Sequence, residues 1–245
     1  MKQLFSLVFV LFISLSGSLK SYAGPPFGTD DPEPVGFRHW EYYLSSMDQF
    51  QPGFSTGTLP HFELNYGLIR GCQIHFELPM NYSVDKNKEF RYGYAFTEIG
   101  FKYRFYSSKD ESFQVGTFPI FEVPTVKNTN FSNNKLQVYL PLWLQKSFGR
   151  FTTYGGGGYW INPGDGNKNW IYAGWEIQYD ISKHFTMGGE LFYKSPAING
   201  THSFVGFNIG GFVNFSEKLH FIWSVGHSIT NDHTTTAYAG FLITI

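Results

Sequence analysis

The sequence of 245 residues has little cysteine, little charge and few long apolar runs. Its single cysteine, Cys72, leaves no disulfide framework. Asp, Glu, Lys and Arg make up 15% of the residues, against roughly 25% in an average soluble domain. The net charge of −1 provides no basic surface for nucleic acid. These scarcities exclude a disulfide-stapled secreted domain and a nucleic-acid-binding protein.

After residue 23 no apolar run approaches the roughly 18 residues that a membrane-spanning helix requires. The long apolar run lies at the start, where Leu4 to Leu15 follows the positive Lys2. Ser21 and Ala23 are small residues at the positions that a signal peptidase reads. We therefore predict a signal peptide over residues 1–23, cleaved near Ala23, and an exported mature chain.

Aromatic residues, by contrast, are abundant at 20%, and the chain alternates apolar and polar positions. Between Pro60 and Met80 one face is apolar and the other carries His, Glu, Asn and Gln. A period of two with one apolar face is typical of a half-buried strand. Twelve such segments follow one another: 37–46, 58–68, 72–82, 94–106, 112–123, 136–147, 151–161, 170–180, 185–194, 204–215, 219–229 and 236–245.

The connections between these segments alternate between short turns and longer loops, among them 47–57 and 83–93. An even number of strands of about ten residues with this alternation is the layout of an outer-membrane barrel. We predict an all-β fold over residues 37–245, a transmembrane antiparallel up-and-down β-barrel of about 12 strands with short periplasmic turns and longer extracellular loops. A water-soluble sandwich or lipocalin-like barrel is the alternative. It fits less well, because the polar faces lack the charge density of a solvent-exposed surface.

The mature chain opens with a proline-rich acidic segment, residues 24–36, that cannot form a ladder strand because proline lacks the N–H donor. We predict that it lies in or across the periplasmic mouth as a plug, with Asp30 and Asp31 against Lys102, Arg104 or Arg38. The alternative is that residues 24–36 form a disordered leader without a fixed place in the barrel. The predicted plug residues are Pro25, Pro26, Phe27, Thr29, Asp30, Asp31 and Pro32.

These residues also carry a resemblance to a known family. Together with Trp40 and Glu41, they resemble the N-terminal signature of outer-membrane transporter-like barrels related to the phenol-degradation meta-pathway protein. The resemblance implies an outer-membrane channel for small molecules. Beyond these positions it covers the chain as a general barrel pattern, and it brings no substrate-binding residues with it.

A His-x-Glu triplet occurs on three successive predicted strands, beginning at His39, His61 and His75. If the second and third strands turn through residues 68–70, His61 lies opposite Glu77 and Glu63 opposite His75, which stabilises both pairs. We predict a polar network in the lumen made of His39, Glu41, His61, Glu63, His75, Glu77, Glu98, Lys102, Arg104 and Glu122.

Three interpretations of this network remain open. The His and Glu side chains could bind a transition metal such as zinc, or the acids could give the lumen a cation preference. The favoured interpretation is a network that satisfies buried polar groups, since a charge inside must be paired or hydrated. We therefore predict no metal site and no cofactor.

An outer-membrane lipid hydrolase needs a Ser and a His on the same strand face. The candidates, His202 with Ser203 and His227 with Ser228, are adjacent pairs and so point to opposite faces. Asn231 and Asp232, which follow the second pair, are ordinary loop formers. We predict no catalytic residues and no enzyme activity.

Taken together, the sequence predicts a monomeric barrel in bacterial outer-membrane lipid, inserted by the barrel-assembly machinery. Its expected function is passive passage of small molecules, including hydrophobic or aromatic ones. The alternatives are a closed structural or adhesive barrel that acts through its extracellular loops and, less favoured, a lipid hydrolase.

Overall fold

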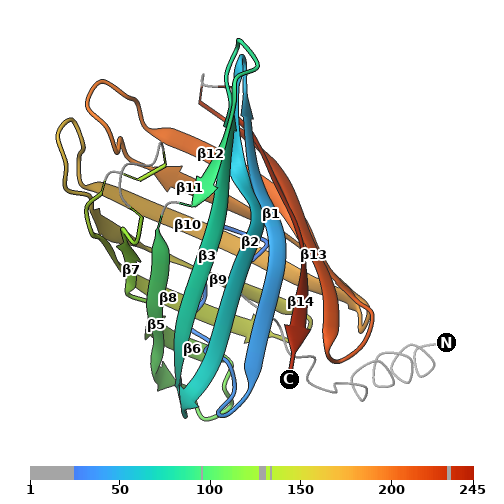
Figure 1. Ribbon diagram of the computed structural model, residues 1–245. Helices are drawn as coiled ribbons and strands as arrows, with labels where there is room; N and C mark the ends of the chain where they lie inside the picture. The colour runs from blue at the N-terminus through green and yellow to red at the C-terminus, as the bar shows by residue number, and fades with distance from the viewer. Residues whose placement is uncertain (1–24, 95, 127–130, 133, 231–232) are drawn as a thin grey trace, which may run out of the picture.

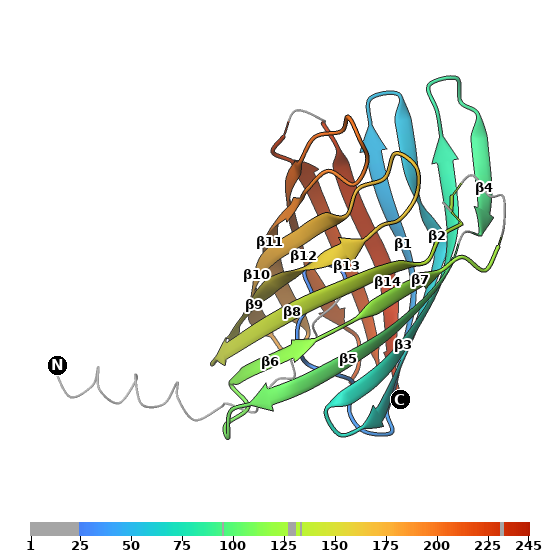
Figure 2. The same ribbon diagram turned by 90° about the vertical axis from the view of Figure 1, so that its left-hand side faces the viewer.

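The computed structural model describes residues 25–94, 96–126, 131–132, 134–230 and 233–245, which form a closed antiparallel β-barrel (Figures 1 and 2). The expected signal peptide and Gly24 lie outside the described residues. Among the described residues there is no helix long and apolar enough to cross a membrane.

Fourteen strands build the wall: β1 (Trp40–Gln51), β2 (Phe54–Ile69), β3 (Cys72–Val84), β4 (Phe90–Tyr94), β5 (Thr97–Ser107), β6 (Phe113–Thr117), β7 (Ile120–Val123), β8 (Gln137–Phe148), β9 (Phe151–Ile161), β10 (Trp170–Ser182), β11 (Phe185–Lys194), β12 (Phe204–Asn214), β13 (Leu219–Ser228) and β14 (Thr235–Thr244). Consecutive strands pair, and β1 pairs with β14, which closes the barrel. Both β4 and β5 pair with β3, and both β6 and β7 pair with β5 and β8. The fourteen strands thus occupy twelve places around the barrel, which confirms the predicted number.

The strand predicted over 112–123 is not continuous. It is divided into β6 and β7 at Phe118 and Pro119, and Figure 2 shows the two pieces in line between β5 and β8. Proline has no N–H to give to the ladder, so a break at this residue is expected. The neighbouring place in the wall is divided in the same way, into β4 and β5.

Two predicted long loops are also wrong. Residues 47–57 continue the ladder of β1 and β2 up to the pair Gln51 and Phe54, and β3 and β4 pair through most of 83–93. Both hairpins rise above the rest of the barrel in Figure 1. The connections that remain long lie at the same end, so we call this end the loop end and the opposite one the turn end. The turn between β1 and β2 consists of two residues, Pro52 and Gly53, whereas the predicted loop over 47–57 had eleven.

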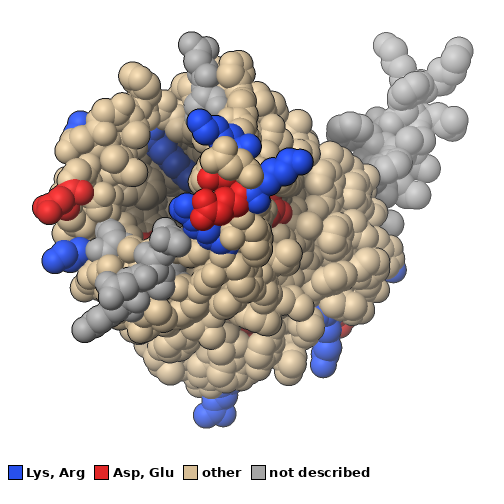
Figure 3. Space-filling model, turned by 45° about the horizontal axis from the view of Figure 1, so that its top comes forward, with Lys and Arg blue, Asp and Glu red and all other residues tan. Residues whose placement is uncertain are grey.

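The predicted alternation sets the two faces of the wall. On β10, Ile171, Trp175 and Ile177 are exposed outside, whereas Tyr172 and Glu176 are buried inside. Figure 3 shows an outer wall with few charged side chains and a hollowed mouth around which charged side chains gather. An apolar exterior around a polar interior is the arrangement of a membrane barrel and the reverse of a soluble one.

The register of β2 and β3 differs from the predicted one by two residues. Glu63 lies opposite Glu77, and His75 lies opposite Asn65. The reversal occurs at Arg70 and Gly71, one residue later than expected, and the φ of Gly71 is +79°. A two-residue hairpin turn needs positive φ, which glycine adopts without strain.

Candidate functional site

The lumen segment, residues 25–36, lies inside the barrel and contacts β3, β5, β6, β8, β10, β11 and β13. Phe27, Thr29, Asp31, Pro32 and Val35 are buried there. The segment therefore spans the width of the lumen and leads into the start of β1 at the turn end.

Glu190 on β11 holds the middle of the segment. Its carboxylate accepts two backbone N–H groups, from Gly28 at 2.9 Å and from Thr29 at 2.7 Å. Charge-assisted bonds of this kind are about twice as strong as neutral ones. Tyr172 Oη lies 3.3 Å from Thr29 Oγ1, and Ser224 Oγ donates to the carbonyl oxygen of Pro26 at 2.6 Å.

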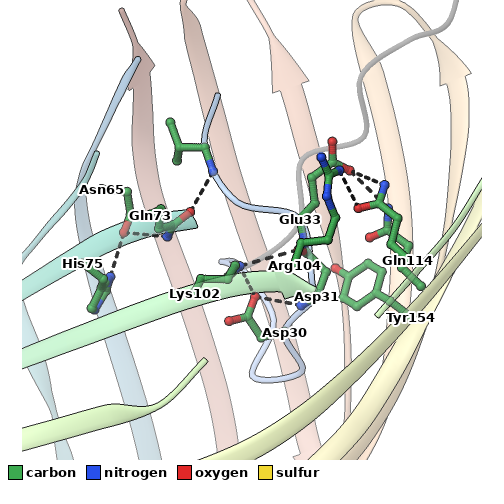
Figure 4. Close-up of polar contacts among 12 residues, drawn as sticks. Asp30, Asp31, Glu33, Asn65, Gln73, His75, Lys102, Arg104, Gln114 and Tyr154 are labelled. Carbon is green, nitrogen blue, oxygen red and sulfur yellow. Dashed lines mark hydrogen bonds and ion pairs between the residues drawn. The ribbon is translucent and has the colours of Figure 1, made fainter. Parts of the chain in front are cut away.

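Lys102 on β5 holds the acidic residues of the segment (Figure 4). Its Nζ lies 2.8 Å from Asp30 Oδ1 and 3.5 Å from Asp31 Oδ1. Asp31 is fully buried, and this burial raises its pKa from 3.8 to about 8 even though Lys102 opposes the shift. Of the three bases considered from the sequence, Lys102 is the one that the described contacts place against these carboxylates. Arg104 donates instead to Gln114 Oε1 at 2.9 Å, and Arg38 lies over the Phe37 ring.

Three further hydrogen bonds fix the end of the segment that leads to β1. Gln114 and Gln145 both donate to Glu33 Oε2, at 3.3 Å and 3.2 Å. The backbone N–H of Val35 donates to Gln73 Oε1 at 2.8 Å (Figure 4).

The wall is shaped for this segment at two glycines. A Cβ on Gly67 would lie 1.9 Å from the carbonyl oxygen of Gly36, and one on Gly174 would lie 2.0 Å from Thr29 Oγ1. Any side chain at these positions would collide with the segment, so glycine permits the close approach.

A cavity of about 1240 Å³ remains beside the segment. It extends from residues at the turn end, such as Lys218 and Ile245, to polar side chains of β2, β3 and β5 in mid-lumen. The segment thus occupies part of the lumen, and the space next to it is lined by charged and polar groups.

Six of the predicted network residues gather on this wall. Glu63, Glu77, Glu98 and Glu122 lie directly opposite one another along β2, β3, β5 and β7. His61 Nε2 is 2.8 Å from Glu77 Oε1, and His75 is 3.5 Å from Glu63 and 3.1 Å from Glu98. The predicted His–Glu pairs therefore meet across the diagonal, which side chains of this length can span. The other four residues of the predicted network, Lys102, Arg104, His39 and Glu41, lie outside this cluster.

His39 and Glu41 do not join the cluster. His39 is exposed, and its Nδ1 lies 3.0 Å from the carbonyl oxygen of Phe37. Glu41 accepts a hydrogen bond from Tyr43 Oη at 3.1 Å. The reason is positional: His39 precedes the first residue of β1, so the first His-x-Glu triplet does not continue the ladder pattern.

Aromatic side chains line the opposite wall of the lumen. Buried and partly buried aromatic side chains of β8 to β12 stack in two groups, Tyr139 with Trp160 and Trp170, and Tyr172 with Phe192 and Phe204. The centroid separations run from 4.8 to 6.1 Å. Lys194 Nζ lies over the rings of Tyr172 and Phe192. The period-two pattern of the sequence points Tyr139, Trp143 and Trp160 inward, because they alternate with the exposed residues of the same strands, and all three are buried.

The candidate hydrolase residues form no catalytic pair. His227 is exposed and lies 3.1 Å from Thr235 Oγ1, whereas Ser228 is buried and accepts from the Thr234 N–H. His202 lies in an exposed loop. Asn231 and Asp232 lie outside the described residues.

Several solved outer-membrane barrels share this fold. The COG4313 outer membrane channel from Pseudomonas putida F1 superposes with a TM-score of 0.67 at 13% identity, over 91% of this chain and 100% of that one. The NanC porin gives 0.58 at 8% identity and the KdgM porin 0.57 at 12%, each over 82% of this chain and 98% of the other. KdgM has also been solved with disordered oligogalacturonate.

At these identities the likeness shows the fold, a single-chain outer-membrane-type barrel. No protein-family model matches the sequence, and no curated protein sequence matches it. The resemblance to the phenol-degradation family therefore rests on the residues between 25 and 41 that were compared above.

Proposed function

We propose that this protein is a channel of the bacterial outer membrane through which small molecules pass passively, and that the lumen segment restricts that passage. The observation that carries the proposal is the segment held across the lumen by Glu190 and Lys102, with a cavity of about 1240 Å³ beside it. Outer-membrane barrels have their short turns on the periplasmic side, so the proposal places the turn end in the periplasm and the loop end on the outside of the cell.

Two properties of the lumen support passage over a purely structural role. The first is space: the wall formed by β2, β3 and β5 borders a cavity large enough for small solutes. The segment is also a separate piece of chain, attached to the wall by side-chain contacts and not by a strand ladder over most of its length.

Small hydrophobic or aromatic solutes belong to the proposed class, because the rings of Tyr43, Phe118 and Phe212 line the cavity beside its polar groups. The protein is proposed to act as a monomer in outer-membrane lipid after insertion by the barrel-assembly machinery.

The test is single-channel conductance of the refolded mature protein in a planar bilayer, with and without residues 25–36. We expect small discrete currents from the intact protein and several-fold larger currents after the deletion. Two folded barrels that both remain silent would contradict the channel.

A reversible tether separates loss of the segment from damage to the wall. The ideal Cβ of Gly174 lies 3.2 Å from the Cβ of Thr29, close to the separation of roughly 3.5 to 4.5 Å in disulfides. Thr29→Cys removes the Oγ1 atom with which a Cβ at position 174 would collide. We therefore expect Thr29→Cys with Gly174→Cys, in a Cys72→Ser background, to form a disulfide that holds the segment. Reduction should raise the conductance, and the single variant Thr29→Cys should not respond.

A further inference from the structure

The aligned glutamates on the cavity wall carry an inference that is independent of solute passage. Glu63, Glu77, Glu98 and Glu122 occupy directly opposite positions on four neighbouring strand segments and point into the lumen. Like charges directly opposite one another destabilise a sheet. Such a row therefore needs either positive charge close by or protons on some of its carboxyl groups.

Lysine and arginine do not supply that charge at the described contacts. The ion pairs of these glutamates are with His61 and His75, whereas Lys102 is engaged with Asp30 and Asp31. Four carboxylates thus face two imidazoles, which carry charge only when protonated.

The hydrogen bonds around His75 show which of its nitrogens faces the row. Asn65 Nδ2 donates to Glu63 Oε1 at 2.8 Å, so Asn65 Oδ1 is the acceptor that faces His75 Nδ1, 2.8 Å away. Gln73 Nε2 donates to the same oxygen at 3.0 Å (Figure 4). An amide oxygen can only accept, so Nδ1 carries a proton.

His75 Nε2 then faces Glu98 Oε1 at 3.1 Å. If the imidazole is neutral, the lone pair of Nε2 meets a carboxylate oxygen, and this contact is satisfied either by a proton held between the two groups or by a cation that both of them bind. The second histidine points into the same place: His61 is 3% exposed, and its Nε2 lies 2.8 Å from Glu77 Oε1.

We propose that His75, Glu77 and Glu98 bind a divalent transition metal ion, with Zn²⁺ as the probe, and that His61 is close enough to complete the site. One ligand atom from each of the first three residues lies within 4.8 Å of the others. Ligands at about 2.1 Å from a tetrahedral ion lie about 3.4 Å apart, so small side-chain rotations close the site.

The surroundings have the features of a metal site beyond its ligands. Asn65 orients His75 through Nδ1, as outer-shell partners do for metal-bound imidazoles. The Phe118 ring packs edge-on against His75 at 5.2 Å and limits its rotation. The site borders the 1240 Å³ cavity, which provides an entry path for the ion.

The experiment is calorimetric titration of ZnCl₂ into the folded mature protein in detergent, at a fixed pH near neutral. We expect one ion per barrel, at least a tenfold loss of affinity in His75→Gln and in Glu98→Gln, and no change in Glu41→Gln. Glu41 is the matched control, because it is a lumen-facing glutamate on the neighbouring β1 that bonds to Tyr43.

A spectroscopic arm covers the case in which a variant folds poorly. Co²⁺ added to the wild-type protein should give visible bands that Zn²⁺ displaces and that an equal concentration of Ca²⁺ does not, since imidazole nitrogen favours zinc and cobalt over calcium. The proposal is overturned by the absence of Zn²⁺ binding, by unchanged affinity in both site variants, or by equal displacement with Ca²⁺. If no ion binds, a proton held between His75 Nε2 and Glu98 Oε1 accounts for their contact.

Discussion

The two sides of the lumen are lined by different kinds of side chain. On β8 to β12 the interior is packed with stacked rings, and Trp143 is 1% exposed. On β2, β3, β5 and β7 it is lined by carboxylates and imidazoles that border a cavity. The lumen segment lies between them and uses both, through Tyr172 and Glu190 on one side and Lys102 on the other.

This difference indicates that the aromatic side contributes mainly to the stability of the barrel and the charged side mainly to its binding properties. Buried aromatic rings contribute stability without requiring a partner charge, whereas each buried carboxylate costs free energy unless it is paired. We therefore expect substitutions on the aromatic side to change the free energy of unfolding. Substitutions on the charged side should change the position of the segment and ion binding.

The largest effect on the aromatic side is expected from Trp143→Ala. It removes a fully buried ring that packs edge-on against Tyr172 at 6.3 Å, and large-to-small changes of this kind cost about 3 to 5 kcal/mol. Urea unfolding of the barrel in lipid vesicles measures the loss. Trp175→Ala, on the outward face and 50% exposed, should cost clearly less. Equal losses would contradict an aromatic core inside the barrel.

On the charged side the strongest expected variant is Lys102→Met. It leaves Asp30 and Asp31 in the lumen without their cation, and breaking a buried pair in this way costs about 3 kcal/mol or more. The segment should leave its site, so the disulfide yield of the Thr29→Cys and Gly174→Cys pair should fall and the conductance should rise. Adding Asp30→Asn and Asp31→Asn should restore the yield. A low yield in this combination would mean that Lys102 supports the wall and not the segment.

The raised pKa of Asp31 predicts that the segment is held less tightly as pH rises. Because burial raises the pKa from 3.8 to about 8, the docked segment binds a proton that the free segment releases. The stabilisation is complete below about pH 4, decreases as the pH rises through the interval up to about 8, and changes no further above it. Conductance should therefore increase between pH 4.5 and 8.5. Asp31→Asn should remove that change, and an unaltered slope in this variant would assign the pH dependence to other groups.

The smallest effect is expected from Ser224→Ala. It removes one hydrogen bond to the carbonyl oxygen of Pro26, which is worth about 1 kcal/mol. Disulfide formation by the Thr29→Cys and Gly174→Cys pair should slow by several-fold at constant pH. A loss as large as that of Lys102→Met would show that the segment is held chiefly through its first residues.

Most of the wall could be predicted from the sequence, because alternation is a local property of the chain. The period of two placed His61 and Glu63 inside and Phe62 outside, where they lie at 3%, 9% and 47% exposure. It also indicated that twelve strand positions make up the barrel, since each strand has its own alternating pattern and its own flanking turn residues. The proline content of residues 24–36 ruled out a strand there for an equally local reason.

The register of the strands and the contact partners of the lumen side chains, in contrast, were decided by the tertiary structure. The turn at Arg70 and Gly71 moved β3 by two residues against β2, which placed Glu63 opposite Glu77 and made a row of glutamates from separate pairs. Nothing local selects Lys102 over Arg104 as the partner of Asp30, because that choice depends on where the segment crosses a closed barrel. Faces follow from neighbours along the chain, whereas contacts across the lumen exist only after β1 and β14 have paired.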